Sequence, residues 1–262
     1  MENALIEILK SAGKLLKEFQ NKVSFQEKDE IEVVSEADFA IEEFLKKELP
    51  KVYNVEVIGE ESLPENFFKP SFNKTYWLID PIDGTLNFLH NLMYVGISVA
   101  LMKEKEPILG IVYNPFLEEF FYAEKGKGAF LNKKPIKVSQ EKNLKNALLV
   151  TSFPGQCKKI GFKKCLILFE IFNEKTRGVR RFGSASIDLA YVACGRFDGM
   201  WQPFLKPWDT AAGILLVKEA GGLVSDYYGK PYHPFKNTLV ASNPYIHKAL
   251  VEITSHYHPE HL

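Results

Sequence analysis

The sequence predicts a mixed α/β fold of two lobes, in which helix and sheet layers alternate and a functional site lies at the seam between the lobes. Two patterns support this prediction. Between residues 55 and 123, five short apolar runs follow one another without intervening helices, whereas from residue 146 onward strands and helices alternate. Strands in direct succession favour an antiparallel sheet, and alternation favours a sheet covered by helices. With 262 residues, the chain is one large domain or two closely packed ones.

The first lobe is expected to span residues 1–142. Apolar side chains recur at helical spacing over residues 5–19, which predicts an amphipathic opening helix. A second helix is expected over about 36–49, where Pro50 ends it. Short apolar, β-branched or aromatic runs then predict strands. These strands are expected at 55–58, 76–79, 95–101, 108–114 and 119–123.

The second lobe is expected to span residues 143–262, after a polar segment at 138–146 that forms the natural boundary. Apolar runs predict its strands and small-residue or amphipathic stretches predict its helices. Strands are expected at 147–152, 178–182, 197–201, 223–226 and 238–242, and helices near 160–173, 185–196 and 209–222.

Composition restricts the classes of function. Lys and Arg number 33, as do Asp and Glu, so the net charge is zero and a broad basic surface for nucleic acid is disfavoured. Three cysteines, Cys157, Cys165 and Cys194, form neither a metal-binding pattern nor a disulfide framework, so we expect small apolar packing residues in a reducing cytoplasm. Charges interrupt the first ten residues too early for a signal peptide, and no apolar run approaches the ~18 residues of a membrane span. We therefore expect a cytoplasmic protein.

The clearest chemical motif is WLIDPIDGTLNFLH at residues 77–90, where an apolar strand ends in acids. Pro81 favours a bend that brings Asp80, the Ile82 carbonyl and Asp83 toward one point. Three oxygens around one point form part of a site for a hard cation. Gly84 and Thr85 begin a short helical turn, whose free N–H groups suit an anion. Cation and phosphate binding are therefore expected side by side.

Three further acids lie next to predicted elements. Glu60 and Glu61 come directly after the strand expected at 55–58, and Asp209 is expected at the N-cap of the helix over 209–222. Alone, each is typical of a turn or a cap. If Glu60, Asp80, Asp83 and Asp209 converge, each pair of charges 4 Å apart costs about 4 kcal/mol at an effective dielectric of 20, so the cluster requires cations. Ligands that are all oxygen favour Mg²⁺ or Mn²⁺ over Zn²⁺.

Taken together, these segments resemble the inositol monophosphatase family of Mg²⁺-dependent, lithium-sensitive sugar phosphatases. GEES at 59–62, WLIDPIDGTLNF at 77–88 and PWDTAAGILLVKEAGG at 207–222 are similar to its three signature segments, in order. The resemblance extends over nearly the whole chain. It implies a layered α-β-α-β-α sandwich, a homodimer and hydrolysis of a phosphate monoester by direct attack of a metal-activated water.

The resemblance also implies roles for individual residues. Glu60, Asp80 and the Ile82 carbonyl would hold a first Mg²⁺, and Asp80, Asp83 and Asp209 a second, with a third, weaker ion near Asp38. Thr85 would orient the attacking water, paired with Asp38, and Glu60 would take part in its activation. The remaining implied roles concern substrate: Asp83, Gly84, Thr85 and Asp209 near the phosphate, and Gly183, Ser184, Ala185 and Gln202 at the alcohol.

Gln202 departs from the inositol-specific pattern, which has a glutamate seven residues before the last metal-binding aspartate. An amide can still accept a hydrogen bond from a ring hydroxyl, and it can also donate one. We expect inositol 1-phosphate as the substrate. Fructose 1,6-bisphosphate, a nucleotide phosphate and histidinol phosphate remain open alternatives.

Two other readings come from different classes. DPIDGTL is similar to the nucleophile motif of haloacid-dehalogenase phosphatases, but there the acids are two residues apart and here Asp80 and Asp83 are three apart. A regulatory binding protein that keeps the fold without turnover is the second alternative. The presence of every expected metal ligand favours the enzyme.

Overall fold

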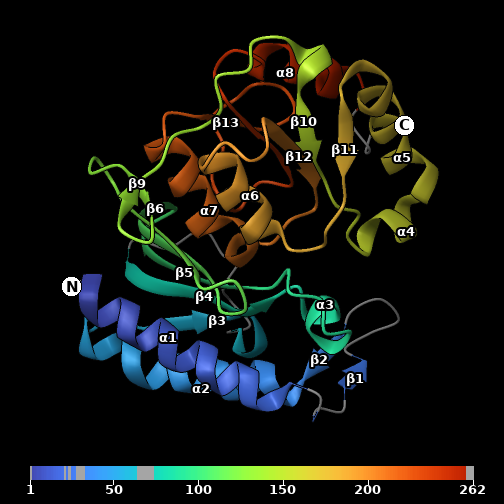
Figure 1. Cartoon of the computed structure of the whole chain (residues 1–262). Coiled ribbons are helices and arrows are strands. Elements are labelled where there is room, and N and C mark those ends of the chain that lie inside the picture. The colour runs from blue at the N-terminus through green and yellow to red at the C-terminus, as the bar shows by residue number, and fades with distance from the viewer. Residues whose placement is uncertain (1, 21, 23–24, 28–32, 64–73, 258–262) are drawn as a thin grey trace.

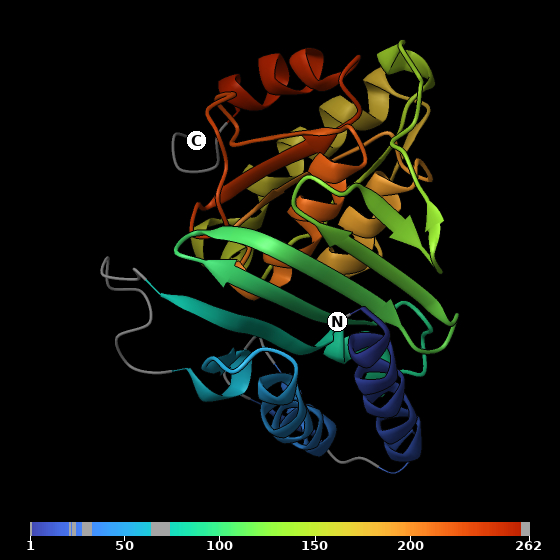
Figure 2. The same cartoon turned by 90° about the vertical axis from the view of Figure 1, so that its left-hand side faces the viewer.

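Five layers of helix and sheet, in the order α-β-α-β-α, make up the structure (Figures 1 and 2). The computed structural model describes residues 2–20, 22, 25–27, 33–63 and 74–257, with backbone alone for 25–27, 33–34 and 160. Three apolar cores separate the layers, one on the outer side of each sheet and one between the sheets. The layered α/β class expected from the sequence is confirmed.

The first sheet has seven strands in the order β3-β4-β5-β6-β7-β8-β9. They are β3 (Val57–Gly59), β4 (Thr75–Asp83), β5 (Gly96–Lys103), β6 (Glu106–Asn114), β7 (Glu119–Glu124), β8 (Ala129–Leu131) and β9 (Lys134–Pro135). All neighbours are antiparallel except β3 and β4, which run parallel. The expectation of an antiparallel sheet was wrong at this edge, because the 15 residues between Gly59 and Thr75 are enough for the long connection that parallel neighbours need.

Helices α1 (Glu2–Phe19) and α2 (Glu36–Glu48) cover the outer face of this sheet. Alternation along β4 sends Trp77 and Ile79 into the core beneath these helices, and Tyr76 and Leu78 into the central core. A short 3₁₀ turn, η1 (Leu49–Lys51), follows α2 at the proline expected to stop it. A small hairpin, β1 (Phe25–Glu27) with β2 (Val33–Ser35), precedes α2.

The second sheet has five strands in the order β11-β10-β12-β14-β13. They are β10 (Leu148–Val150), β11 (Gly178–Arg180), β12 (Gly199–Pro203), β13 (Leu223–Ser225) and β14 (Thr238–Ser242). Strand β10 is parallel to both neighbours, whereas β14 is antiparallel to β12 and β13. Helices α5 (Phe162–Lys175) and α8 (His247–His256) pack on its outer face. Short helix α4 (Gln156–Ile160) and the 3₁₀ turn η3 (Leu144–Asn146) complete this half.

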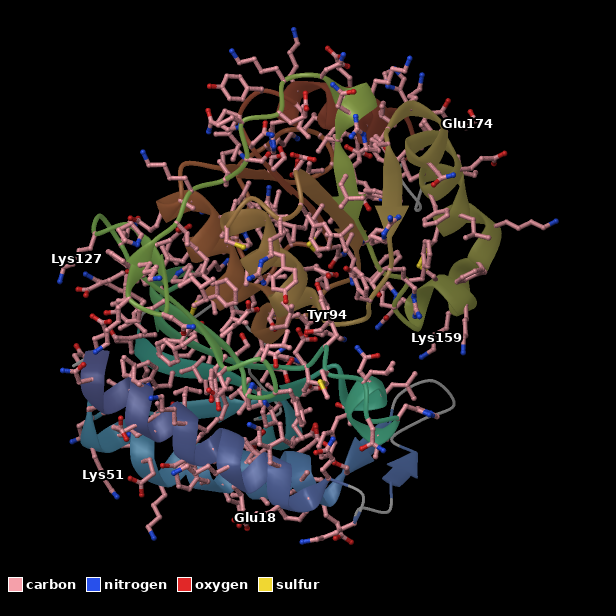
Figure 3. All side chains as sticks on the ribbon, in the orientation of Figure 1. Glu18, Lys51, Tyr94, Lys127, Lys159 and Glu174 are labelled. Atoms are coloured by element: carbon pink, nitrogen blue, oxygen red, sulfur yellow. A yellow bond between two sulfur atoms is a disulfide. The ribbon has the colours of Figure 1, made fainter. Side chains whose placement is uncertain are left out.

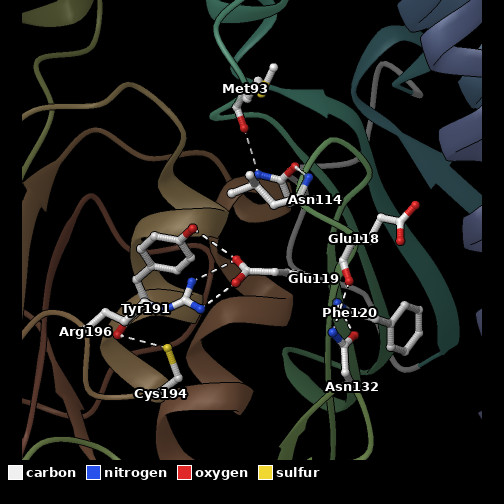
Figure 4. A network of polar contacts seen from close by, with 10 residues as sticks. Met93, Asn114, Glu118, Glu119, Phe120, Asn132, Tyr191, Cys194 and Arg196 are labelled. Carbon is white, nitrogen blue, oxygen red and sulfur yellow. Dashed lines mark hydrogen bonds and ion pairs between the residues drawn. The ribbon is translucent and has the colours of Figure 1, made fainter.

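The central layer consists of α6 (Ala185–Ala193) and α7 (Pro207–Glu219), which lie between the two sheets. At Gly110 a Cβ would lie 2.7 Å from the Ala212 carbonyl oxygen, so β6 and α7 are in close backbone contact. Glu119 of β7 accepts hydrogen bonds from Arg196 and from the Tyr191 hydroxyl (Figure 4). Because one core joins both halves, the division near residue 142 stays a prediction.

The cysteines differ from the expectation. Cys157 and Cys165 form a disulfide with their Cα atoms 6.0 Å apart, and Cys194 is the unpaired cysteine. Helices α4 and α5 meet at Gly161, which brings two residues with no recognisable spacing motif together. Cysteine usage therefore gives no ground for a reducing compartment. No helix in the described ranges is long and apolar enough to cross a membrane.

Candidate active site

The end of strand β4 carries two of the predicted acids at a bend. Between Asp80 and Asp83 the pairing of β4 with β5 shifts by one residue, which is a β-bulge at Pro81 and Ile82. The Asp80 carboxylate accepts the Ile82 N–H at 3.1 Å. The Ile82 side chain is buried in the outer core, so its backbone carbonyl turns toward Thr85, whose hydroxyl lies 3.0 Å away. The proline bend expected from the sequence therefore sets the direction of both carboxylates.

A left-handed glycine redirects the chain into the next element. Gly84 has φ +99°, a conformation that side chains with a Cβ rarely adopt, and it precedes the short helix α3 (Thr85–Leu89). The Thr85 hydroxyl lies 3.2 Å from a carboxylate oxygen of Asp38. Asp38 is the third residue of α2 and also accepts the Ser35 N–H at 2.8 Å and the Ser35 hydroxyl at 2.6 Å. The structure thus brings Thr85 and Asp38 together, 47 residues apart in sequence.

A second buried acid on α2 fixes the turn that carries Glu60. Residues Glu60–Ser62 form a 3₁₀ turn, η2, and Glu42 accepts the Glu61 N–H at 2.9 Å and the Ser62 hydroxyl. Lys46 pairs with Glu42 at 3.0 Å. Sequence reasoning missed Glu42, although its position four residues after Asp38 places both on one face of a helix.

Asp209 enters the site from the central layer. Its helix begins at Pro207, so Asp209 is the third helical residue, and the expected N-cap position was wrong. The proline suits the first helical position because its missing N–H has no helical partner there, and this moves the start of α7 two residues upstream. One oxygen of Asp209 accepts the Lys206 N–H at 2.8 Å.

Asp83 connects the two halves of the site. One of its oxygens accepts the Ser184 hydroxyl at 2.8 Å and the Ser186 N–H at 2.6 Å, both more than 100 residues away in sequence. Gly183 lies at the pocket with φ +86°, whereas Ser184 and Ala185 are buried. The structure therefore places Ser184 against a predicted metal ligand, and this contact was not expected.

Four of the predicted acids, Glu60, Asp80, Asp83 and Asp209, line one pocket of about 310 Å³, whereas Asp38 is not in its lining. Its lining residues are Glu60, Asp80, Ile82, Asp83, Gly84, Thr85, Leu86, Asn87, Ser152, Pro154, Gly155, Arg181, Gly183 and Asp209. Arg181 is an exposed cation at this acidic pocket that sequence reasoning missed. Gln202 does not line the pocket: it is 4% exposed, and its side-chain carbonyl oxygen has no hydrogen-bond partner within the described residues.

Burial, reinforced at Asp80 and Asp209 by neighbouring negative charge, dominates the electrostatics of the pocket. Burial, followed by the charges of Glu60, Asp83, Asp209 and Asp38, raises the pKa of Asp80 well above its usual value. Burial first, with Asp83 and Glu60, raises the pKa of Asp209 in the same way. For Asp83, burial raises the pKa and the hydrogen bonds from Ser186 and Ser184 oppose the rise. These raised pKa values mean that the pocket favours carboxyl groups that are protonated or bound to a cation over carboxylates with neither.

The donor set fits a hard divalent cation. Every candidate ligand is a carboxylate or carbonyl oxygen, and Asp80, Asp83 and Asp209 each use one oxygen in a hydrogen bond that orients the side chain. In the described part of the chain, no group of three acidic, histidine or cysteine side chains is arranged to hold an ion as it stands.

Comparison with known proteins identifies relatives over the full length. A sequence model of the inositol monophosphatase family matches residues 1–258. An inositol-1-monophosphatase of Rhizobium meliloti is 39% identical over 96% of this chain and 94% of its own. A protein of Pseudomonas aeruginosa named Nus factor SuhB is 40% identical, again over 96% of this chain and 94% of its own. The solved IMPase of Thermotoga maritima superposes on this chain with a TM-score of 0.87 and is 34% identical to it. The match covers 99% of each chain.

Proposed function

Because this chain belongs to the inositol monophosphatase family, we propose that it hydrolyses phosphate monoesters with Mg²⁺ and that inositol 1-phosphate is its substrate. One observation supports the chemistry most strongly. Four acids from β4, η2 and α7 line a single pocket beside the Gly84–Thr85 turn. Magnesium held by these acids would neutralise phosphate charge and lower the pKa of a bound water.

The protein's own groups would position the reactants. Asp38 accepts the Thr85 hydroxyl, which leaves a lone pair of the Thr85 oxygen to accept a hydrogen bond from the attacking water. Helix α3 begins at Thr85, and Gly84, Thr85 and Leu86 line the pocket, so N–H groups without helical partners are available there for phosphate oxygens. Arg181, at the same pocket, supplies a positive charge for the substrate's anionic oxygens.

Recognition of the alcohol is proposed for Gln202. Its buried carbonyl oxygen lacks a partner among the described residues, and a buried acceptor without a partner costs free energy that a substrate hydroxyl could recover. Gln202 lies on β12, seven residues before Asp209, so both residues belong to the same β12–α7 segment of the second half. Because Gln202 does not line the pocket, its contact with a ring hydroxyl requires β12 or the loop after it to move when the alcohol binds.

The test is phosphate release from a panel of esters: inositol 1-phosphate, fructose 1,6-bisphosphate, a nucleoside monophosphate and histidinol phosphate. Each is measured with Mg²⁺, with EDTA and with Mg²⁺ plus Li⁺. We expect release that needs Mg²⁺, is suppressed by Li⁺ and has its highest kcat/KM on inositol 1-phosphate. A higher kcat/KM on another ester would overturn inositol 1-phosphate as the proposed substrate but would still support hydrolysis of phosphate monoesters.

A non-catalytic regulatory role is the second candidate, since several relatives carry the name Nus factor. The same panel distinguishes the two. No release from any ester by folded protein that binds Mg²⁺ would favour the regulatory role.

We also propose a homodimer. Leu92 and Met93 are more than half exposed next to the pocket, and Phe182, stacked on Tyr94, is 40% exposed. Tyr94 lies where the two halves meet (Figure 3). Exposed apolar side chains gathered in one region support an interface between copies. Sedimentation equilibrium would give the mass of a dimer if this is correct and the mass of a monomer if it is not.

A further inference from the structure

A second cavity lies on the outer side of the first sheet, away from the acidic pocket. Its volume is about 610 Å³, within the 300–1,000 Å³ common for small-molecule sites. Helix α1 forms one wall, and β6, β7 and the turn between β8 and β9 form the other. The two cavities share no lining residue.

Four lysines surround this cavity. Lys10, Lys14 and Lys17 follow one another at spacings of four and three residues, so they share one face of α1. Lys133 approaches from the opposite wall, where its ammonium donates to the Asn3 side chain at 3.1 Å. With Glu7 and Glu118 also in the lining, the cavity carries two net positive charges.

The three helix lysines have no ion-pair partner within the described residues, although acids lie near them in sequence. Glu7 precedes Lys10 by three residues and Glu18 follows Lys14 by four, spacings at which ion pairs form on helices. Like charges three and four residues apart repel one another on a helix face. An anion bound between them would relieve this repulsion.

The floor of the cavity is aromatic and carries a hydroxyl without a partner. The rings of Tyr113 and Phe120 lie with centroids 5.9 Å apart. The Tyr113 hydroxyl makes no hydrogen bond in the part of the chain that the structure describes, and it is not one of the fully buried polar atoms there, so it is open to the cavity. Asn132 bonds the Phe120 N–H at 3.0 Å and the Glu118 carbonyl at 3.1 Å, which fixes this wall (Figure 4).

A glycine holds the helix close to this floor. A Cβ on Gly13 would lie 2.7 Å from the Tyr113 ring and 2.7 Å from the Pro115 Cβ. The backbone of α1 therefore approaches the sheet closely, and the exposed lysines of this helix line the cavity beside that contact.

We propose that this cavity binds a small organic phosphate that carries a flat ring. The ring would lie in the cavity against the exposed edges of Tyr113 and Phe120, with the Tyr113 hydroxyl as a hydrogen-bond partner. The phosphate would lie among Lys10, Lys14, Lys17 and Lys133. The site is independent of the function proposed for the acidic pocket.

The test uses 1-naphthyl phosphate as the probe, measured by equilibrium dialysis in EDTA. Without a divalent cation, the acidic pocket repels a phosphate, so binding reports on the lysine-lined cavity. We expect 1-naphthyl phosphate to bind at least about tenfold more tightly than either inorganic phosphate or 1-naphthol, because each lacks one half of the recognition.

Matched variants locate the binding. Lys10→Ala with Lys14→Ala should weaken binding at least about tenfold, and Tyr113→Phe should weaken it about threefold while keeping the ring. Lys47→Ala with Lys51→Ala removes the same charge from neighbouring α2 and η1 and should leave binding unchanged. The proposal would be overturned if 1-naphthyl phosphate did not bind to the parent protein. It would also be overturned if the Lys10/Lys14 and Lys47/Lys51 double variants lost equal amounts of affinity.

Discussion

Asp83 is the residue at which the two halves of the acidic pocket meet. It ends β4, yet its hydrogen bonds come from Ser184 and Ser186 at the start of α6. The sequence motif predicted that Asp83 would be near Asp80, because both follow one strand. It did not predict the serine contacts, since a link across more than 100 residues leaves no local pattern.

Replacing Asp83→Asn should reduce phosphate release by about 100-fold or more, equivalent to about 2.7 kcal/mol of transition-state stabilisation. Removing one like charge from the cluster should leave the metal-free protein as stable as the parent or slightly more stable. Release is measured at saturating Mg²⁺, and stability by urea unfolding in EDTA. Glu174→Gln on exposed α5 is the charge-matched control. Undiminished release in the Asp83 variant would contradict the metal assignment.

Gln202→Glu should raise the ratio of kcat/KM for inositol 1-phosphate over other sugar phosphates by about tenfold, because a carboxylate accepts hydrogen bonds from ring hydroxyls more strongly than an amide. The exposed change Gln140→Glu adds the same charge elsewhere and should leave the ratio alone. An unchanged ratio in the Gln202 variant would show that this residue does not select the alcohol.

At the scale of elements, periodicity identified the long helices and the buried strands correctly. It missed α8, β8 and β9, which are short or weakly patterned, and it missed the parallel pairing of β3 with β4. Pairing direction depends on where a connecting segment returns, and local sequence does not encode this. For the same reason the Asp38–Thr85 contact came only from the family resemblance.

The contact between α8 and the second sheet gives a prediction of pH dependence. His247 lies between the hydroxyls of Ser242, at 2.9 Å, and Ser225, at 3.0 Å, and burial lowers its pKa to about 4. The folded pKa lies below the unfolded value near 6.5, so the stabilisation is complete above about pH 6.5 and is lost as pH falls toward 4. The loss at pH 4 should be on the order of 3 kcal/mol.

His247→Gln should remove this part of the pH dependence. The unfolding free energies of parent and variant are measured at pH 7 and at pH 4, and the difference between the two proteins is compared between the two pH values. Titration of the acidic pocket contributes equally to both proteins and cancels from this difference. Equal slopes for the two proteins across that range would show that His247 is not held neutral by the fold.

Helices α4 and α5 provide a chemical prediction. Protein prepared without reductant should show one reactive thiol per unfolded chain, that of Cys194, and three after reduction. Reduction should lower the unfolding free energy by about 2–3 kcal/mol, the entropy of a short closed loop. A thiol assay in denaturant measures the number of reactive thiols, and urea unfolding measures the change in unfolding free energy. Three thiols without reductant would contradict the pairing.

At the scale of the whole molecule, the account depends on a pocket that neither half completes alone. Glu60, Asp80 and Asp83 come from the first half and Asp209 from the second, and α7 places Asp209 between the two sheets. The layered class and the four acids could be predicted from sequence because three of the acids lie at the ends of patterned strands and Asp209 lies at the start of a patterned helix. The disulfide, Glu42 and the serine contacts could not, because they arise from how separate elements pack.

The most direct test of this account measures phosphate release as a function of Mg²⁺ for the parent protein and for Asp209→Asn. We expect no release in EDTA, saturable release with Mg²⁺, and a loss of about 100-fold or more in Asp209→Asn. Release that persists in EDTA, or that survives the loss of the Asp209 charge, would contradict a metal site shared by the two halves of the chain.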